Sequence, residues 1–384
     1  MTGKDMLKGI QNMDADLIEE AEFGTFGKRQ TRFSGKTKLL LVLAAALIVG
    51  TMTAAVVFTR WSTTAQTRYN PTQEIKEQAQ KSGLSVMLEE TNEIENPNEV
   101  LSATDQGITI TAVQSLVDNY GAEITFRVEG VDLTEGQYPT AWPEVTIDGD
   151  LFFSRSKSGG FFDGTTRNEE GQWVYASTGE PVRFRDDALQ SAILDWAADD
   201  GSMEYTYYIS FLKTDGRYMG KEIVFRFHSI DFESEQKGGA SEPSIEGNWE
   251  LKWTLTGTSD SITVTPNAKI GDSDVVLLDA EIGQLSLRTR YQVKEYWEGW
   301  DELVVLPQGV CGVRMKDGSE YWCVESSFGF ENREKMIYFI ESTMYDGILD
   351  ISQVESLIFP KGWGLDDRGR PTIETYCYIP VSVE

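Results

Sequence analysis

Histidine and cysteine are almost missing from this chain of 384 residues, which holds one His and three Cys. With His228 as the only imidazole, every mechanism that needs two histidines is excluded. Basic residues are also scarce, since 34 Lys and Arg stand against 62 Asp and Glu and give a formal net charge of -28. Binding to nucleic acid depends on neutralising phosphates with Lys and Arg, so this balance argues against direct nucleic-acid binding.

Proline is scarce as well, with 11 residues, whereas hydrophobic residues make up 40% of the chain. A chain of this length and composition can bury a core, which excludes global disorder and a collagen-like structure. Its length is that of roughly two domains with extensions.

One long uncharged run stands near the N-terminus, LLLVLAAALIVGTMTAAVVF, over residues 39–58. At about 1.5 Å per residue, a helix of this length matches the thickness of a bilayer's hydrocarbon core. The alternatives are a buried helix of a soluble protein and a signal peptide cleaved at Ala65, but a signal peptide has a shorter apolar region and a shorter leader. We therefore expect an uncleaved transmembrane helix, with the lipid bilayer as a partner.

Basic residues are more frequent before this run than after it. This predicts a protein of the cell membrane whose N-terminus is cytoplasmic and whose C-terminal part is extracytoplasmic. Residues 1–60 contain 8 basic and 6 acidic residues, so the remainder has a net charge of about -30. An exterior this acidic suits cations or basic proteins as partners, although solubility alone also explains it. The residues counted are Lys28, Arg29, Arg32, Lys36 and Lys38 before the run, and Arg60, Arg68 and Lys76 after it.

The predicted cytoplasmic segment, residues 1–38, is too short to bury a core and must act as a peptide. Its apolar residues recur at steps of three and four, which is typical of one face of a helix that docks on a partner. A disordered tail in front of an anchor is the alternative. The predicted partner-binding residues are Met6, Leu7, Ile10, Met13, Leu17 and Ile18.

Residues 59–100 read as a juxtamembrane helix followed by an acidic linker. Asn70 is a favourable helix cap, Pro71 fits the first helical position, and Gly83 fits the end of the helix. The stretch EETNEIENPNEV up to Val100 is acidic and poor in apolar side chains, so we expect the globular part to begin near Leu101.

From residue 101 onward the pattern changes to period two, the spacing of half-buried strands. Residues 107–116 and 122–130 are predicted to form a hairpin, and Trp249, Leu251, Trp253 and Leu255 share one face of a later strand. The sequence thus predicts a mainly β protein: a single N-terminal transmembrane helix followed by two antiparallel, immunoglobulin-like β-sandwich domains, over residues 101–257 and 258–384.

Several segments together resemble membrane-anchored, anti-sigma-factor-like proteins of Gram-positive bacteria that carry an extracytoplasmic domain of unknown function. They are MLKGIQNMDADLIEEAE, the basic run before a single span, ATDQGITITAVQSLVDNYGAEITFRVEG, EGNWELKWTL and YDGILDISQVESLIFP. The resemblance implies that the cytoplasmic segment holds an extracytoplasmic-function sigma factor and that the exterior senses the cell envelope. The His-x-x-x-Cys-x-x-Cys zinc signature of the better-known anti-sigma class is absent.

The three cysteines, Cys311, Cys323 and Cys377, lack the close spacing of a zinc site, so we expect no metal. A two-residue turn within 316–319 would place Cys311 and Cys323 on opposite faces of a hairpin. A disulfide of Cys377 with Cys311 or Cys323 is then the prediction, and three buried thiols are the alternative.

One aromatic cluster, EYWEGWDE, is most simply a strand end with a loop, buried in the core. If it is exposed, Tyr296, Trp297 and Trp300 form a ligand patch that would stack on sugars or hold calcium with the neighbouring carboxylates. No pair of carboxylates is singled out for catalysis, so we expect neither an enzyme nor a cofactor.

The leading function is a regulator whose cytoplasmic segment sequesters a sigma factor, with an envelope component or a protease as outside partner. A cell-envelope binding module for glycan or protein, with an inert tail, is the main alternative; an extracellular hydrolase is the third.

Overall fold

The computed structural model describes most of the chain beyond residue 60. Three predicted features lie outside the described residues: the cytoplasmic segment with its residues from Met6 to Ile18, the span at 39–58, and the patch of Tyr296, Trp297 and Trp300. Within the described part, no helix is long and apolar enough to cross a bilayer. The described ranges are 61–90, 98–133, 137–152, 157–168, 172–182, 200–211, 216–234, 244–271, 273–293, 309–332, 334–365 and 371–381.

Two short helices come first, α4 (Thr63–Tyr69) and α5 (Gln73–Ser82). Ser62 caps α4 by accepting a hydrogen bond from the Ala65 amide, and Thr72 caps α5 in the same way. Asn70, predicted to cap α5, instead ends α4 in the left-handed conformation with φ 39°. The prediction that Gly83 ends the second helix is confirmed, with φ 81°.

The described chain is mainly β, with strands β1 to β13 forming the first group. They make antiparallel sheets of six strands (β1-β3-β4-β11-β8, with β2 on β3), five strands (β13-β12-β6-β7, with β5 on β12) and two strands (β10-β9). The bounds are β1 Ser85–Met87, β2 Ser102–Asp105, β3 Ile108–Val117, β4 Gly121–Glu129, β5 Gln137–Thr140, β6 Glu144–Ile147, β7 Asp150–Leu151, β8 Lys157–Phe161, β9 Thr165–Arg167, β10 Trp173–Tyr175, β11 Met203–Ser210, β12 Glu222–Ser234 and β13 Ile245–Thr254, with a 3₁₀ turn at Leu88–Glu90.

The predicted hairpin is confirmed as β3 and β4, which pair antiparallel. The folded structure begins earlier than Leu101, because β1 pairs with β3 within the six-stranded sheet. Residues 85–87 are therefore part of the sheet. Residues 91–97 of the predicted acidic linker lie outside the described residues.

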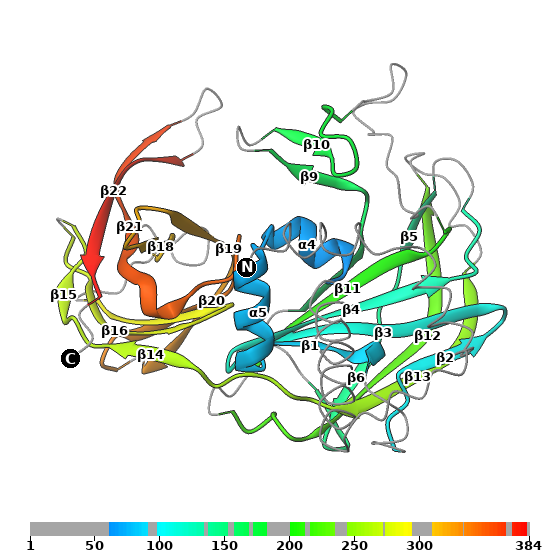
Figure 1. Cartoon of the computed structure of the whole chain (residues 1–384). Helices are drawn as coiled ribbons and strands as arrows, with labels where there is room; N and C mark the ends of the chain where they lie inside the picture. Colours follow the sequence, from blue (N-terminus) through cyan, green and yellow to red (C-terminus); the bar gives the residue numbers. More distant parts are fainter. Residues whose placement is uncertain are drawn as a thin grey trace, which may run out of the picture. The chain divides into compact units, whose positions relative to one another are not determined.

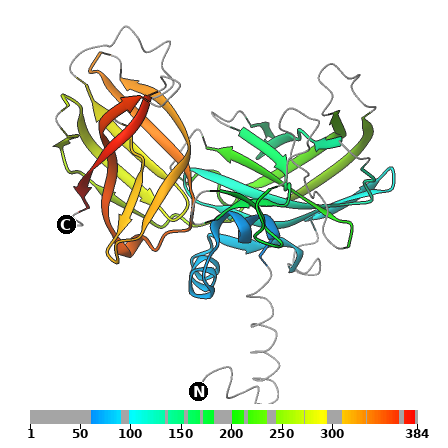
Figure 2. The same ribbon diagram turned by 90° about the horizontal axis from the view of Figure 1, so that it is seen from above.

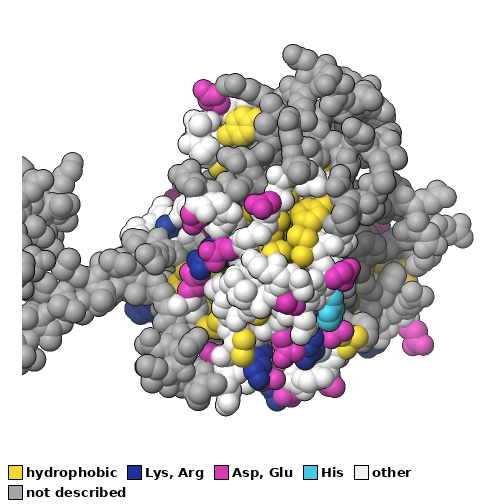
Figure 3. Space-filling model, turned by 90° about the vertical axis from the view of Figure 1, so that its right-hand side faces the viewer, with side chains coloured by type: hydrophobic (Ala, Val, Ile, Leu, Met, Phe, Trp, Pro, Cys, Tyr) yellow, Lys and Arg dark blue, Asp and Glu magenta, His cyan; other side chains and the backbone are white. Residues whose placement is uncertain are grey.

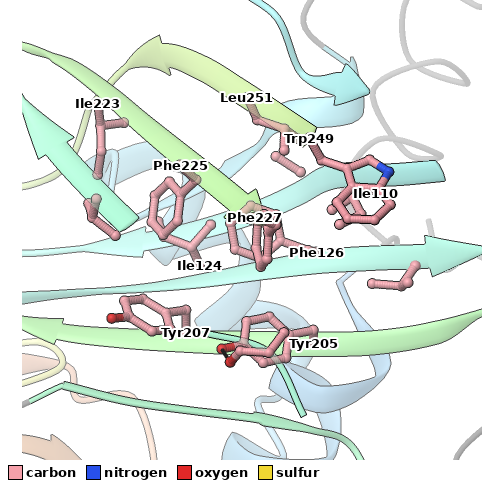
Figure 4. Packing of buried hydrophobic residues seen from close by; sticks show 14 of the residues in the cluster. Ile110, Ile124, Phe126, Tyr205, Tyr207, Ile223, Phe225, Phe227, Trp249 and Leu251 are labelled. Atoms are coloured by element: carbon pink, nitrogen blue, oxygen red, sulfur yellow. Dashed lines mark hydrogen bonds between the residues drawn. The ribbon is translucent and has the colours of Figure 1, made fainter. Parts of the chain in front are cut away.

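The core of the first group lies between its six-stranded and five-stranded sheets (Figure 4). Phe126 of β4 meets Phe225 of β12 at 5.0 Å between ring centroids, and Phe225 stacks on Trp253 of β13 at 5.4 Å. The predicted single face of β13 is confirmed, since Trp249, Leu251, Trp253 and Leu255 are all buried. Alternation along each strand thus sends one row of side chains into this core.

Strands β14 to β22 form the second group, a nine-stranded antiparallel sheet in the order β14-β16-β17-β20-β19-β18-β21-β22, with β15 on β16. It has its own hydrophobic core. The bounds are β14 Ser261–Val264, β15 Ala268–Lys269, β16 Val276–Gly283, β17 Leu287–Gln292, β18 Gly312–Met315, β19 Glu320–Asn332, β20 Ile337–Tyr345, β21 Val354–Leu365 and β22 Pro371–Pro380, with a 3₁₀ turn at Ile351–Gln353.

This sheet curls over on itself. Tyr291 of β17 and Phe359 of β21 are separated by three intervening strands, yet their ring centroids are 6.3 Å apart. Tyr291 also stacks on Tyr338 of β20 at 5.1 Å. The two ends of the sheet therefore share one core.

The β18–β19 hairpin differs from its prediction by one residue. Gly312 pairs with Trp322, and the Met315 amide donates to the Ser319 carbonyl oxygen, so the loop has three residues rather than two. Gly318 takes φ 90° in this loop, which favours glycine. As a result Cys323 lies opposite Cys311, whose carbonyl oxygen accepts a hydrogen bond from the Cys323 amide at 2.8 Å. The prediction that Cys311 and Cys323 lie on opposite faces of the hairpin is therefore wrong.

Figures 1 and 2 show the second group (yellow to red) beside the first (cyan to green), with α4 and α5 (blue) close to the place where the groups meet. The connection from β13 to β14 passes there too: the Thr258 amide donates to the Val117 carbonyl oxygen at 3.0 Å. A side chain at Gly257 would come within 2.7 Å of Val117. This close approach requires glycine.

Candidate functional site

Polar and apolar contacts between distant segments gather around α4 and α5, in a region called here the junction. It contains a buried apolar cluster that draws on the helices, on β3 and on the second group. Because the cluster joins residues up to 287 positions apart, it ties the start of the described chain to both groups of strands. Its members are Trp61, Ala65, Tyr69, Ala79, Leu84, Leu116, Leu285 and Ile348.

The start of α4 is held by hydrogen bonds to two side chains of the six-stranded sheet. Glu204 of β11 accepts from the backbone amides of Thr63 at 2.8 Å and Thr64 at 2.6 Å, and from the Thr64 hydroxyl at 2.7 Å. Gln114 of β3 accepts from the amide and hydroxyl of Ser62, at 3.0 and 2.9 Å. A carboxylate at this end also suits the positive pole of the helix dipole.

A buried carboxylate holds the other end of α4. The Glu123 side chain of β4 is 0% exposed, and its Oε2 accepts from the Arg68 guanidinium at 2.6 Å and from the Tyr69 hydroxyl at 2.7 Å. The Glu123 charge raises the pKa of Arg68, while burial, together with Glu123, raises the pKa of Tyr69. Both donors therefore keep their protons, and the buried negative charge stays compensated.

α5 connects to the second group. The Ser82 hydroxyl donates to Oε1 of Gln284, which lies in the turn between β16 and β17, at 2.8 Å. After the helix, the Leu84 carbonyl oxygen accepts from the Val117 amide at 2.9 Å. Leu84 and Leu285 are both fully buried in the junction.

Asp118, at the end of β3, joins the two groups directly. Its Oδ1 accepts from the amides of Tyr120 at 2.9 Å and Gly121 at 3.2 Å, and its Oδ2 accepts from the Ser286 hydroxyl. A side chain at Gly283 would come within 2.9 Å of Asp118 Oδ2, so glycine is needed for this approach. Burial raises the pKa of Asp118 although these hydrogen bonds oppose the rise.

Chemically, the junction can hold segments together and shows no arrangement typical of catalysis. Its carboxylates, Glu123, Glu204 and Asp118, are each occupied by donors of the chain itself. Over the described ranges, no group of three or more His, Cys, Asp and Glu side chains is placed to bind a metal ion.

The predicted cysteine site consists of Cys311, Cys323 and Cys377. All three cysteines are half-buried thiols. Burial raises the pKa of Cys311 to about 11, and the neighbouring Cys377 adds to the rise. The disulfide of Cys377 with Cys311 or Cys323 stays a prediction.

Sequence reasoning missed the functional side chains of the junction. In β4 the period-two pattern assigns Ala122, Ile124 and Phe126 to the core and Glu123 to the opposite, solvent face, where a carboxylate is ordinary. The structure instead covers this second face with α4, so Glu123 is buried. Only Ser62, a good cap before TTAQTRY, signals that a helix lies here.

On the face shown in Figure 3, Asp and Glu side chains are dispersed among Lys and Arg. On the five-stranded sheet, Arg226 pairs with Glu144 at 3.2 Å and with Glu250 at 2.7 Å. Exposed pairs of this kind add little stability. Arg226 thus places a positive charge between two carboxylates of this sheet.

Comparison with known proteins yields little. No protein-family model matches the chain, and no curated protein matches it. Among solved structures, a conserved domain protein from Bacillus anthracis is similar, with 14% sequence identity and a TM-score of 0.37 over 77% of this chain and 92% of that chain. A likeness this low carries no argument, so we argue function from the residues themselves.

The raised pKa of Asp118 predicts a specific pH dependence. Between the unfolded value near 3.8 and the higher folded value, the folded state binds more protons, so Asp118 lowers stability as pH rises through its folded pKa. Relative to Asp118→Asn, the native chain should lose stability from about pH 4 upward, as measured by urea unfolding at several pH values.

Asp317→Asn is the control, because hydrogen bonds from Ser319 lower the pKa of Asp317. Its contribution has the opposite sign: it is present at neutral pH and lost as pH falls through the lowered pKa. A difference between native and Asp118→Asn stability that stays constant from pH 4 to 8 would contradict the assignment.

Proposed function

We propose that the chain is a single-pass membrane regulator of a bacterial cell envelope and not an enzyme. Its cytoplasmic segment, residues 1–38, sequesters an extracytoplasmic-function sigma factor. The span at 39–58 anchors it, and the acidic β-rich exterior, built as two immunoglobulin-like sandwiches, acts as the sensor. An envelope component or a protease outside the cell is the partner of the exterior.

The observation that carries this proposal is the junction. A tether that serves only as an anchor needs no fixed structure after the span, and a flexible linker of polar residues suffices. Here Trp61, three residues beyond the predicted span, is already buried, and α4 begins two residues later. Any rearrangement of the six-stranded sheet around Glu123 or Glu204 therefore acts on the segment that leads to the membrane.

The junction also offers a route from the second group of strands. Gln284 contacts α5, and Ser286 contacts the β3–β4 turn through Asp118. A ligand bound by either group can thus bias α4 and α5, provided that it binds the two arrangements with different affinity. This is the property expected of a sensor.

The test is capture of the sigma factor by the full chain. Tagged protein, solubilised from the membrane of its source bacterium, should recover a sigma factor. Leu17→Asp and Ile18→Asp should each reduce recovery at least tenfold, because they place a charge on the apolar docking face. Recovered proteins are identified and quantified by mass spectrometry.

Asn12→Asp is the matched control, since it adds the same charge on the polar side of the predicted helix and should leave recovery unchanged. If no sigma factor is recovered with the native chain, or if all three variants recover it equally, the regulatory proposal fails.

A second candidate is a cell-envelope binding module, and one feature of the second group favours it. Tyr376 and Tyr378 of the edge strand β22 point to one face and are 36% and 42% exposed. Trp322 of β19 lies against Tyr376, with 5.1 Å between ring centroids, and Tyr378 donates to Glu320 at 3.1 Å. Exposed rings beside polar groups suit sugars, which present an apolar face and hydroxyls.

A glycan array tests this candidate with the full chain in detergent. If cell-wall oligosaccharides bind at the face of Tyr376, Tyr376→Ala should weaken their binding at least tenfold. If they bind instead at the predicted patch around Trp297, Trp297→Ala should weaken their binding to the same extent. Trp142→Ala is the control, because Trp142 is 58% exposed in the first group. Equal binding by the native chain and all variants, or no binding, rejects the glycan site.

A further inference from the structure

α4 rests on a face of the six-stranded sheet that is mainly polar. Strand residues alternate between the core and this face, and those under or beside α4 include Gln114, Glu123, Thr125 and Glu204. The apolar part of the contact comes from Trp61, Ala65 and Tyr69. Burial of these apolar side chains resists opening, whereas water can replace the hydrogen bonds that hold both ends of the helix to the polar face.

The docked position also leaves buried polar atoms unsatisfied. Within the described part of the chain, Trp61 Nε1, Glu123 Oε1 and Thr206 Oγ1 are buried and have no hydrogen-bond partner. A buried group without a partner costs free energy that hydration restores. Undocking of α4 would expose these atoms to water, and their hydration would offset part of the free-energy cost of undocking.

α5 is held in a different way. The segment after it continues into β1, whose Ser85 pairs with Leu116 of β3, and Leu84 and Ala79 are buried in the junction. Thr72 caps α5 without any contribution from α4, since its hydroxyl accepts from the Ile75 amide at 3.3 Å. α5 can therefore stay folded and docked when α4 leaves.

Between the two helices lies a ready hinge. Asn70 ends α4 with φ 39° and ψ 46°, a left-handed conformation that asparagine adopts less readily than glycine but more readily than most other residues, and Pro71 follows it. Only Asn70 and Pro71 separate the end of α4 from the cap of α5. A change of the Asn70 torsions or of the Pro71 ψ angle moves α4 and the residues before it relative to α5.

From these observations we infer that α4 undocks from the sheet as a unit, turning at Asn70 and Pro71, while α5 and β1 stay in place. Hydrogen bonds to Glu204 and Glu123 hold the N-terminal and C-terminal ends of α4 on the sheet in the docked state. This inference concerns the folded exterior and goes beyond the proposed function, because it holds whether or not the chain binds a sigma factor.

Hydrogen exchange followed by mass spectrometry tests the motion in the full chain, held in lipid nanodiscs without any partner. The amides that close α4, such as Asn70 to the Gln66 carbonyl oxygen, should exchange at least tenfold faster than those of α5 and of β3 and β4. Glu123→Gln and Glu204→Gln should each speed exchange in α4 a further tenfold without changing α5.

Glu129→Gln is the matched control, since Glu129 lies on the same strand as Glu123 but is exposed. Asn70→Gly serves if the other variants fold poorly: it accepts the left-handed conformation at lower cost and should slow exchange in α4. Exchange of α4 at the same rate as α5, or only together with β4, would overturn the inference. The sigma-factor capture does not depend on this result.

Discussion

A buried carboxylate fixes the first described part of the chain, the part that follows the predicted span. Glu123 is fully buried, and a buried charge destabilises a fold strongly unless donors surround it. Arg68 and Tyr69 supply those donors from consecutive positions of α4. The position of α4 on the sheet, the burial of Trp61 and the direction from which the chain enters the β structure all depend on this contact.

Asp118 links the two groups of strands. It closes the β3–β4 turn through backbone amides and reaches Ser286 of the β16–β17 turn. Glu123 and Asp118 lie at the same end of one hairpin, so a single supersecondary unit contacts both the helices and the second group. This hairpin therefore links α4 and α5 to the second group of strands.

Much of the β architecture follows from the sequence, because alternation is a strong signal wherever one face of a strand meets a core. The row Trp249, Leu251, Trp253 and Leu255 is an example, and so is the β3–β4 hairpin. Turn chemistry was less decisive: a loop of three residues instead of two at Lys316–Gly318 shifted the predicted register of Cys311 and Cys323.

The junction could not be predicted in the same way. A polar strand face reads as solvent-exposed unless something covers it, and the covering helix has only seven residues and three buried side chains, Thr64, Ala65 and Tyr69. Local signals also misplaced the second helix cap, because Asn70 suits both a cap and a left-handed helix end. Tertiary contact with Glu123 and Glu204 decided between them.

The central claim, that Glu123 and α4 form one energetic unit, is tested most directly by a double-mutant cycle of Arg68→Ala and Glu123→Gln. Unfolding free energies of the native chain, both single variants and the double variant give the coupling. We expect about 1–3 kcal/mol, because Arg68→Ala leaves a buried charge that Glu123→Gln removes. Additive effects, with a coupling near zero, would contradict the claim.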